Sequence, residues 1–175
     1  MNAQTAFEFQ WLSPLGISVS LFLAQGVLTV FVALLVLVFN PRFSGVARAD
    51  AGDGGLVLSG RMDSSFFGRD MRAVIRNDPV MAQADLYTMY VRAGLWLAIG
   101  IFQISLVWFG MRDRQVWAFW TVVAANAAAL VGWLLVAWAY VKKGVSFGLD
   151  LPPVVFLLPV FLVPVASMLG WIGLR

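Results

Sequence analysis

The chain has 175 residues, of which 61% are hydrophobic and only 12% are charged, and its formal net charge is +3. Soluble domains carry about 25% charged residues, so these charges are too few to cover a water-facing surface. The absence of Cys excludes disulfides and thiolate chemistry, and the absence of His excludes the most common ligand of metals and haem. The composition therefore predicts an integral membrane protein, and we expect no nucleic-acid partner.

Four apolar stretches without charges lie between the charged residues, and a helix needs about 20 apolar residues to cross a bilayer. The second stretch gains length at its start, where Asn77-Asp78-Pro79 has the form of a helix cap followed by Pro. We therefore predict an all-α fold, a bundle of four transmembrane helices in a single membrane domain over residues 1–175. The expected helices cover about 14–39, 79–111, 116–141 and 151–174, with a long first loop over 40–78.

The first helix is expected to be retained rather than cleaved as a signal peptide, because no Lys or Arg precedes it and its apolar run is long. With four helices, nine Lys and Arg residues fall on one side of the membrane and three on the other. The positive-inside rule applies to loops of this length. It predicts that both termini lie outside the cytoplasm, and we expect the membrane to be a bacterial inner membrane. The three basic residues on the side of the termini are Arg112, Arg114 and Arg175.

Within the first loop, Ser64–Arg76 has the pattern of an amphipathic helix. At about 100° per residue, its apolar side chains fall on one face and its arginines on another. We expect this helix to lie on the membrane surface, with its arginines toward acidic headgroups. The alternative is that it packs on a soluble partner or on the start of the second helix. The apolar face consists of Phe67, Met71, Val74 and Ile75, and the basic face consists of Arg69, Arg72 and Arg76.

Small residues at helical spacing favour close packing between membrane helices. Such ridges occur on the first three predicted helices, and the simplest interpretation is a compact bundle. A sharper interpretation is that the outward face of the third helix receives a helix from another subunit. The ridges are formed by Gly16, Ser20 and Ala24, by Gly94 and Ala98, and by Ala124, Ala128 and Gly132, with Ala125 and Ala129 beside the last.

Three amide side chains, Gln25, Gln103 and Asn126, are predicted to lie near the bilayer midplane. At 1.5 Å per residue, the last two lie about 16–18 Å from the charged ends of their helices. Pro159 and Pro164 also leave backbone carbonyls in the fourth helix without amide partners. Because uncompensated amides in hydrocarbon are costly, these groups should meet each other. They either fix the register of the bundle, or bind the oxygen of a quinone, sterol, carotenoid or lipid.

Several classes of chemistry are disfavoured. No ionisable residue lies in the core of a predicted span, and such residues usually mark proton relays and ion-coupled transport. Without His, general acid–base catalysis would depend on loop carboxylates and arginines, so we do not expect an enzyme. Asp50, Asp53 and Asp63 lack the spacing of a calcium loop, so no metal site is predicted. No cofactor is expected beyond a bound lipid, quinone or carotenoid.

Three segments carry a resemblance to a known group of proteins. Leu37-Val38-Phe39-Asn40-Pro41 closes the first predicted helix, and Asp85 followed by Tyr90-Val91-Arg92-Ala93-Gly94 opens the second. Arg112-Asp113-Arg114-Gln115-Val116-Trp117-Ala118 forms a tight turn. Together they resemble the DoxX-like group of small four-helix bacterial membrane proteins, from which the chain departs in its long first loop. The resemblance implies a four-helix bundle and a partner subunit of a redox complex.

These observations favour one function and leave a second open. The favoured one is a non-catalytic integral membrane subunit that associates with a larger membrane complex and packs against lipid or isoprenoid. The alternative is a stand-alone binder or transporter of a lipid, quinone or other hydrophobic small molecule. The expected partners are membrane lipids together with membrane-protein subunits or further copies of the chain.

Overall fold

The computed structural model describes residues 9–43, 60–145 and 158–175. Its helices are α1 (Pro14–Phe43), α3 (Gly60–Phe67), α4 (Met71–Asn77), α5 (Pro79–Ser105), α6 (Val116–Lys142) and α7 (Leu158–Leu174). A short π-helix, η1 (Leu106–Met111), continues α5 directly. Within these ranges the structure contains helices and turns but no strand, so the all-α prediction is confirmed for them.

Three helices are long and apolar enough to cross a membrane: Pro14–Val38, Pro79–Met111 and Val116–Lys142. The fourth predicted helix is present in part, because α7 is apolar but shorter, with 17 residues. Residues 151–157, where we expected this helix to begin, lie outside the described residues. Three of the four predicted membrane helices therefore have the length that a crossing requires.

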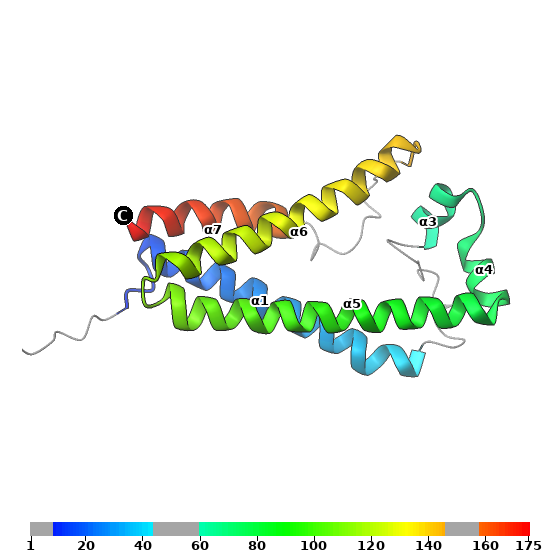
Figure 1. Cartoon of the computed structure of the whole chain (residues 1–175), viewed down its shortest axis with the longest axis horizontal. Helices are drawn as coiled ribbons and strands as arrows, with labels where there is room; N and C mark the ends of the chain where they lie inside the picture. The colour runs from blue at the N-terminus through cyan, green and yellow to red at the C-terminus, as the bar shows by residue number, and fades with distance from the viewer. Residues whose placement is uncertain (1–8, 44–59, 146–157) are drawn as a thin grey trace, which may run out of the picture.

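The helices alternate in direction along the bundle (Figure 1). The start of α1, the turn between η1 and α6, and the end of α7 lie at one end. The other end carries α3, α4, the start of α5 and the end of α6. The first half of α6 packs on η1 and α7, whereas its second half leans away from the other long helices. Among the described residues, the long helices are thus packed together at one end, which we call the closed end, and spread apart at the other, which we call the open end.

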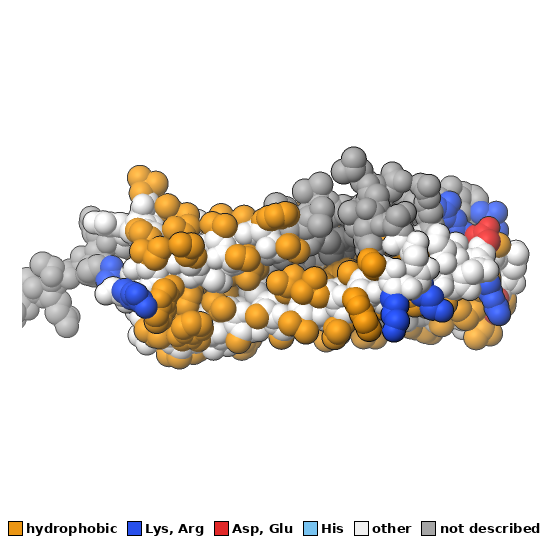
Figure 2. All heavy atoms as spheres, turned by 90° about the horizontal axis from the view of Figure 1, so that it is seen from above, with side chains coloured by type: hydrophobic (Ala, Val, Ile, Leu, Met, Phe, Trp, Pro, Cys, Tyr) orange, Lys and Arg blue, Asp and Glu red, His pale blue; other side chains and the backbone are white. Residues whose placement is uncertain are grey.

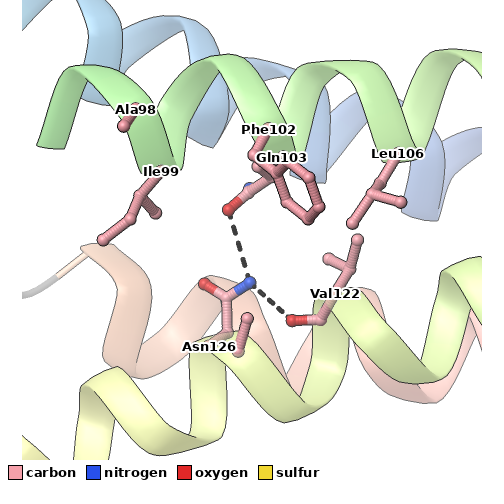
Figure 3. Close-up of a pocket in the computed structure, with 8 residues that line it drawn as sticks. Ala98, Ile99, Phe102, Gln103, Leu106, Val122 and Asn126 are labelled. Carbon is pink, nitrogen blue, oxygen red and sulfur yellow. Dashed lines mark hydrogen bonds between the residues drawn. The ribbon is translucent and has the colours of Figure 1, made fainter. Parts of the chain in front are cut away.

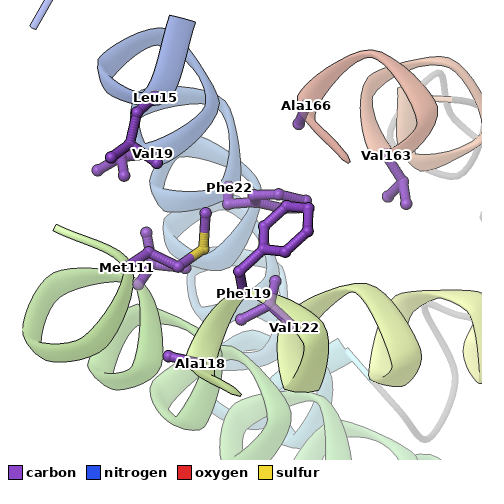
Figure 4. Close-up of a cluster of buried hydrophobic side chains, with 10 residues drawn as sticks. Leu15, Val19, Phe22, Met111, Ala118, Phe119, Val122, Val163 and Ala166 are labelled. Atoms are coloured by element: carbon purple, nitrogen blue, oxygen red, sulfur yellow. The ribbon is translucent and has the colours of Figure 1, made fainter. Parts of the chain in front are cut away.

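The closed end contains the main hydrophobic core (Figure 4). Phe22 of α1 and Phe119 of α6 meet at its centre, beside Met111 of η1. Since lipid tails are as apolar as these side chains, the core is stabilised by close packing rather than by removal from water. Its buried members are Leu15, Val19, Phe22, Val107, Met111, Ala118, Phe119, Val122, Val163 and Ala166. This core joins α1, η1, α6 and α7, and its members on α6 all lie in the first half of that helix.

The helices α1 and α5 cross closely at two glycines, Gly26 and Gly100. A Cβ atom added to Gly100 would lie 2.7 Å from Val30 Cγ2 and 3.1 Å from the carbonyl oxygen of Gly26. A Cβ added to Gly26 would lie 2.9 Å from Ile104 Cγ1. The two backbones can therefore approach this closely only because both positions lack side chains.

Small-residue packing was predicted for α1, but at other residues. Ser20 and Ala24 are exposed, and the Ser20 hydroxyl donates a hydrogen bond to the carbonyl of Gly16 on its own helix, at 2.9 Å. Gly16 is buried, but Ser20 and Ala24 are not internal contacts, because α1 turns its larger side chains, Val19 and Phe22, into the core. The neighbouring face of α1 carries Gly26 to α5 instead.

The single helix predicted over Ser64–Arg76 is also corrected, since two short helices occupy this segment. Gly68 separates them by adopting a positive φ of 66°, a conformation that Gly adopts without strain. Asp70 then caps α4, because its carboxylate accepts hydrogen bonds from the backbone N–H groups of Arg72 and Ala73 at 3.1 and 3.2 Å. Arg69 lies in the break, so the three arginines do not form one continuous helical face.

The surface of the molecule is apolar along its length and charged at its ends. In the view of Figure 2, hydrophobic side chains cover the middle of the bundle, and Lys and Arg gather at both ends. Exposed large apolar side chains occur on all the long helices, for example Phe31, Phe102 and Leu135. This distribution suits a molecule whose ends contact water and headgroups while its middle contacts lipid tails.

Candidate functional site

The three amides Gln25, Gln103 and Asn126 come together at the junction of α1, α5 and α6. Gln25 Nε2 donates a hydrogen bond to Asn126 Oδ1 at 2.7 Å, and Asn126 Nδ2 donates to Gln103 Oε1 at 3.4 Å. Gln103 Nε2 donates to the carbonyl of Phe22 at 2.9 Å, and Asn126 Nδ2 also donates to that of Val122 at 2.9 Å. One chain of hydrogen bonds thus links the three helices in an apolar environment.

The predicted meeting of the amides with the carbonyls that Pro159 and Pro164 leave without amide partners falls partly outside the described residues, because Val155 is one of the two carbonyl residues. The helix α7 is linked to α1 by another polar contact, in which the Ser18 hydroxyl donates to the carbonyl of Ala166 at 2.7 Å. Pro164 lies inside α7. Gly170 lies beside Ser18 and Phe119, where a Cβ would come within 2.7 Å of the Ser18 oxygen.

A cavity of about 290 Å³ lies between α5 and α6, next to the amides (Figure 3). Two of its lining side chains, Gln103 and Asn126, are polar. Small-molecule sites typically have apolar walls with a few polar groups that converge on one point. The other lining residues are Ala98, Ile99, Phe102, Leu106, Val122 and Ala125. The cavity therefore has the composition of a site for an apolar molecule with one polar group.

The amides retain hydrogen-bonding capacity. A primary amide has two donor hydrogens and an oxygen that can accept two hydrogen bonds. Gln25 Oε1 is buried and has no hydrogen-bond partner within the described ranges. The Asn126–Gln103 contact, at 3.4 Å, is long for an N–H···O hydrogen bond. Asn126 Nδ2 could therefore donate to a ligand oxygen in place of this long contact, whereas amides supply neither a proton nor a nucleophile at neutral pH.

A second polar contact, which the sequence did not indicate, holds α3 against the open end of α6. The Tyr140 hydroxyl donates to the carboxylate of Asp63 at 2.5 Å, and Asp63 is fully buried. The ring of Phe66 stacks on that of Tyr140 with centroids 4.3 Å apart. Met62 and Val145 complete this contact, which we call the α3–α6 clamp. Its partners are 77 residues apart in the chain, so no local pattern could have revealed it.

The ridge predicted on the third helix is open. Ala124, Ala128 and Gly132 are all exposed on α6, and a Cβ added to Gly132 would meet no atom within 4 Å. The apolar side chains around it, such as Leu135 and Trp138, are exposed as well. Within the described part of the chain, this ridge does not pack a helix of the bundle itself.

The predicted basic face is divided between two elements. Arg69 is exposed in the break between α3 and α4, while Arg72 and Arg76 lie one turn apart on α4. Met71 of α4 is buried, and α4 packs on α5. Among the described residues, no group of His, Cys, Asp or Glu could hold a metal ion.

Comparisons with known proteins add no relative to this picture. The chain matches no protein-family model, and neither a curated protein nor a solved structure matches it.

Proposed function

We propose that this chain is a non-catalytic integral membrane subunit that associates with a larger membrane complex through the outer face of α6. The observation that supports this most directly is the open ridge of Ala124, Ala128 and Gly132. Exposed Leu or Trp is ordinary in lipid, but small residues let two helix backbones approach closely. A ridge that the bundle leaves unused is therefore suited to a helix from another subunit or another copy of the chain.

Docking at this ridge is tested by two variants of α6 that add the same bulk on different faces. Ala128→Leu places three carbon atoms on the ridge, whereas Ala127→Leu places them beside it, at a position that is also exposed. Overpacking costs about 1–3 kcal/mol, so Ala128→Leu should weaken the assembly by roughly tenfold or more. Native mass spectrometry in mild detergent should show a defined complex for wild type and Ala127→Leu, and the separate chain for Ala128→Leu. A solitary wild-type chain, or equal assembly of both variants, would contradict the proposal.

The same proposal includes an orientation, with both termini outside the cytoplasm of a bacterial inner membrane. It is supported by the excess of Lys and Arg at the end of the bundle that carries α3, α4 and Lys142. On this orientation, Arg72 and Arg76 of α4 lie near the acidic headgroups of the cytoplasmic leaflet.

Because the chain contains no Cys, single cysteines can report its orientation directly. In intact cells, Arg175→Cys should react with a membrane-impermeant maleimide, and Lys143→Cys should react only after the inner membrane is opened. Both positions are exposed, so burial does not limit either reaction. The reverse pattern of labelling would show that the termini are cytoplasmic.

The cavity between α5 and α6 favours a second function, the binding of an apolar small molecule. Its support is the convergence of Gln103 and Asn126 on a space of about 290 Å³ with otherwise apolar walls. This function is compatible with membership of a complex, since the residues of α6 that line the cavity, Val122, Ala125 and Asn126, are not the ridge residues, although Ala125 lies beside the ridge.

A further inference from the structure

We infer that the cavity between α5 and α6 binds an apolar molecule that carries a hydroxyl group, and that this hydroxyl bridges Asn126 and Gln103. The inference rests on the binding function proposed for the cavity and adds the chemical class of the ligand. It follows from the shape of the cavity and from the direction of each amide hydrogen bond.

The cavity is reached from the side of the bundle. Ile99 and Phe102 line it and are 52% and 63% exposed, so they lie where the cavity opens onto the outer surface of the helices. In a membrane this surface faces lipid tails, and an apolar ligand would enter laterally. A volume of about 290 Å³ lies at the small end of ligand sites. It fits a small molecule, or the polar end of a longer one whose tail remains in the lipid.

On the polar side of the cavity, one donor, Asn126 Nδ2, faces one acceptor, Gln103 Oε1. Gln103 turns its nitrogen toward α1, where it donates to the carbonyl of Phe22. Its oxygen therefore faces Asn126 (Figure 3). At 3.4 Å, this contact is the longest of the network, whose other hydrogen bonds measure 2.7–2.9 Å. It is the bond that a ligand would exchange at the lowest cost.

A hydroxyl group matches this pair on both sides. It can accept a hydrogen bond from Asn126 Nδ2 and donate one to Gln103 Oε1, so it replaces everything that it displaces. The exchange leaves the bonds from Gln25 to Asn126 and from Gln103 to Phe22 in place. The amides therefore stay oriented while the ligand binds.

Other polar groups match less well. A ketone or an ether can accept from Asn126 but leaves Gln103 Oε1 without a donor in an apolar site. An unsatisfied buried acceptor of this kind corresponds to a loss of about tenfold or more in affinity. A hydrocarbon gains no hydrogen bond, and a charged headgroup finds no charged side chain among the residues that line the cavity. The site thus selects alcohols from among apolar molecules.

The experiment compares three probes that share one skeleton: farnesol, farnesyl methyl ether and farnesene. Each competes with tritiated farnesol for the full chain, purified in detergent. We expect farnesol to bind wild type at least about tenfold more tightly than the ether or the hydrocarbon. Asn126→Leu should remove this preference. Dodecanol serves as a fourth probe: binding equal to farnesol indicates any apolar alcohol, and weaker binding indicates a branched isoprenoid one.

A second pair of variants keeps the proposal testable if Asn126→Leu does not fold. Ala125→Trp fills the cavity from its lining, and Ala127→Trp adds the same ring on a neighbouring face outside it. Binding of every probe should be lost in Ala125→Trp and retained in Ala127→Trp. If the alcohol and the ether bind equally and Ala125→Trp removes both, the cavity binds ligands but the hydroxyl inference is wrong. If no probe binds, the apolar molecules that co-purify with wild type are compared with those that co-purify with Ala125→Trp. If the two sets are the same, the proposed binding function is wrong as well.

Discussion

Replacing Gly100 by Leu should destabilise the bundle more than any other single change discussed for this chain. A Cβ at this position lies 2.7 Å from Val30 Cγ2 and 3.1 Å from the backbone oxygen of Gly26. Val30 is β-branched and nearly fixed in a helix, and the backbone of α1 cannot move without disturbing the core. We expect the free energy of unfolding to fall by about 3 kcal/mol, at the upper end of the range for overpacking.

The matched control is Gly94→Leu on the same helix, where an added Cβ meets no atom within 4 Å. Both changes gain the same intrinsic helix propensity, up to about 1 kcal/mol, so their difference isolates the crossing of α1 and α5. Unfolding of the detergent-solubilised protein by SDS gives the free energy of each variant. Equal stabilities of the two variants would show that the helices do not cross at Gly26 and Gly100.

Tyr140→Phe is expected to release the α3–α6 clamp while leaving the bundle folded. The change keeps the ring that stacks on Phe66 and removes only the hydroxyl that donates to the buried carboxylate of Asp63. A hydrogen bond to a charged group contributes about 1.5–3 kcal/mol. Opening of the clamp should therefore become roughly thirtyfold more frequent, which is the factor that corresponds to about 2 kcal/mol.

A cysteine placed at Met62 measures this opening, because Met62 is 8% exposed at the centre of the clamp. Its reaction rate with a maleimide should rise by the same factor of about thirty in the Tyr140→Phe background. Tyr87→Phe removes an identical hydroxyl from an exposed tyrosine of α5 and should leave the rate unchanged. Rapid labelling already present in the parent chain would mean that α3 does not rest on α6.

The features that the sequence predicted well depend either on local interactions or on the high free-energy cost of leaving a polar group without a hydrogen bond in an apolar environment. The start of α5 at Pro79 follows from Asp78, whose carboxylate accepts hydrogen bonds from the N–H groups of Val80 and Met81. The meeting of Gln25, Gln103 and Asn126 follows from the cost of an unpaired amide in an apolar environment. Neither conclusion requires knowledge of how the helices pack.

The features that the sequence did not predict are those for which the sequence contains several patterns of similar strength, and only the packing of the helices decides among them. Small residues occur on several faces of α1, and only the packing of Phe22 into the core decides that Gly26, rather than Ala24, meets α5. At Gly68, the apolar residues keep a helical spacing on both sides of the glycine, so this pattern predicted one continuous helix. A local signal for the break was nevertheless present in the sequence. Asp70, two residues after Gly68, is a favourable cap for a new helix.

Because the core contacts α6 only near its start, a small tilt of this helix moves its far end more than its middle. Phe119 holds the helix near its start, and Tyr140 lies about 31 Å further along at 1.5 Å per residue, whereas Asn126 lies only about 10 Å along. A rigid tilt about Phe119 therefore moves the Tyr140 ring about three times as far as it moves the amide. Displacing the ring by about 3 Å would separate Asn126 from Gln103 by about 1 Å more, which is enough to break their 3.4 Å contact. If α6 tilts in this way, a change in the position of α3 at the far end of the helix would change the width of the cavity near its middle.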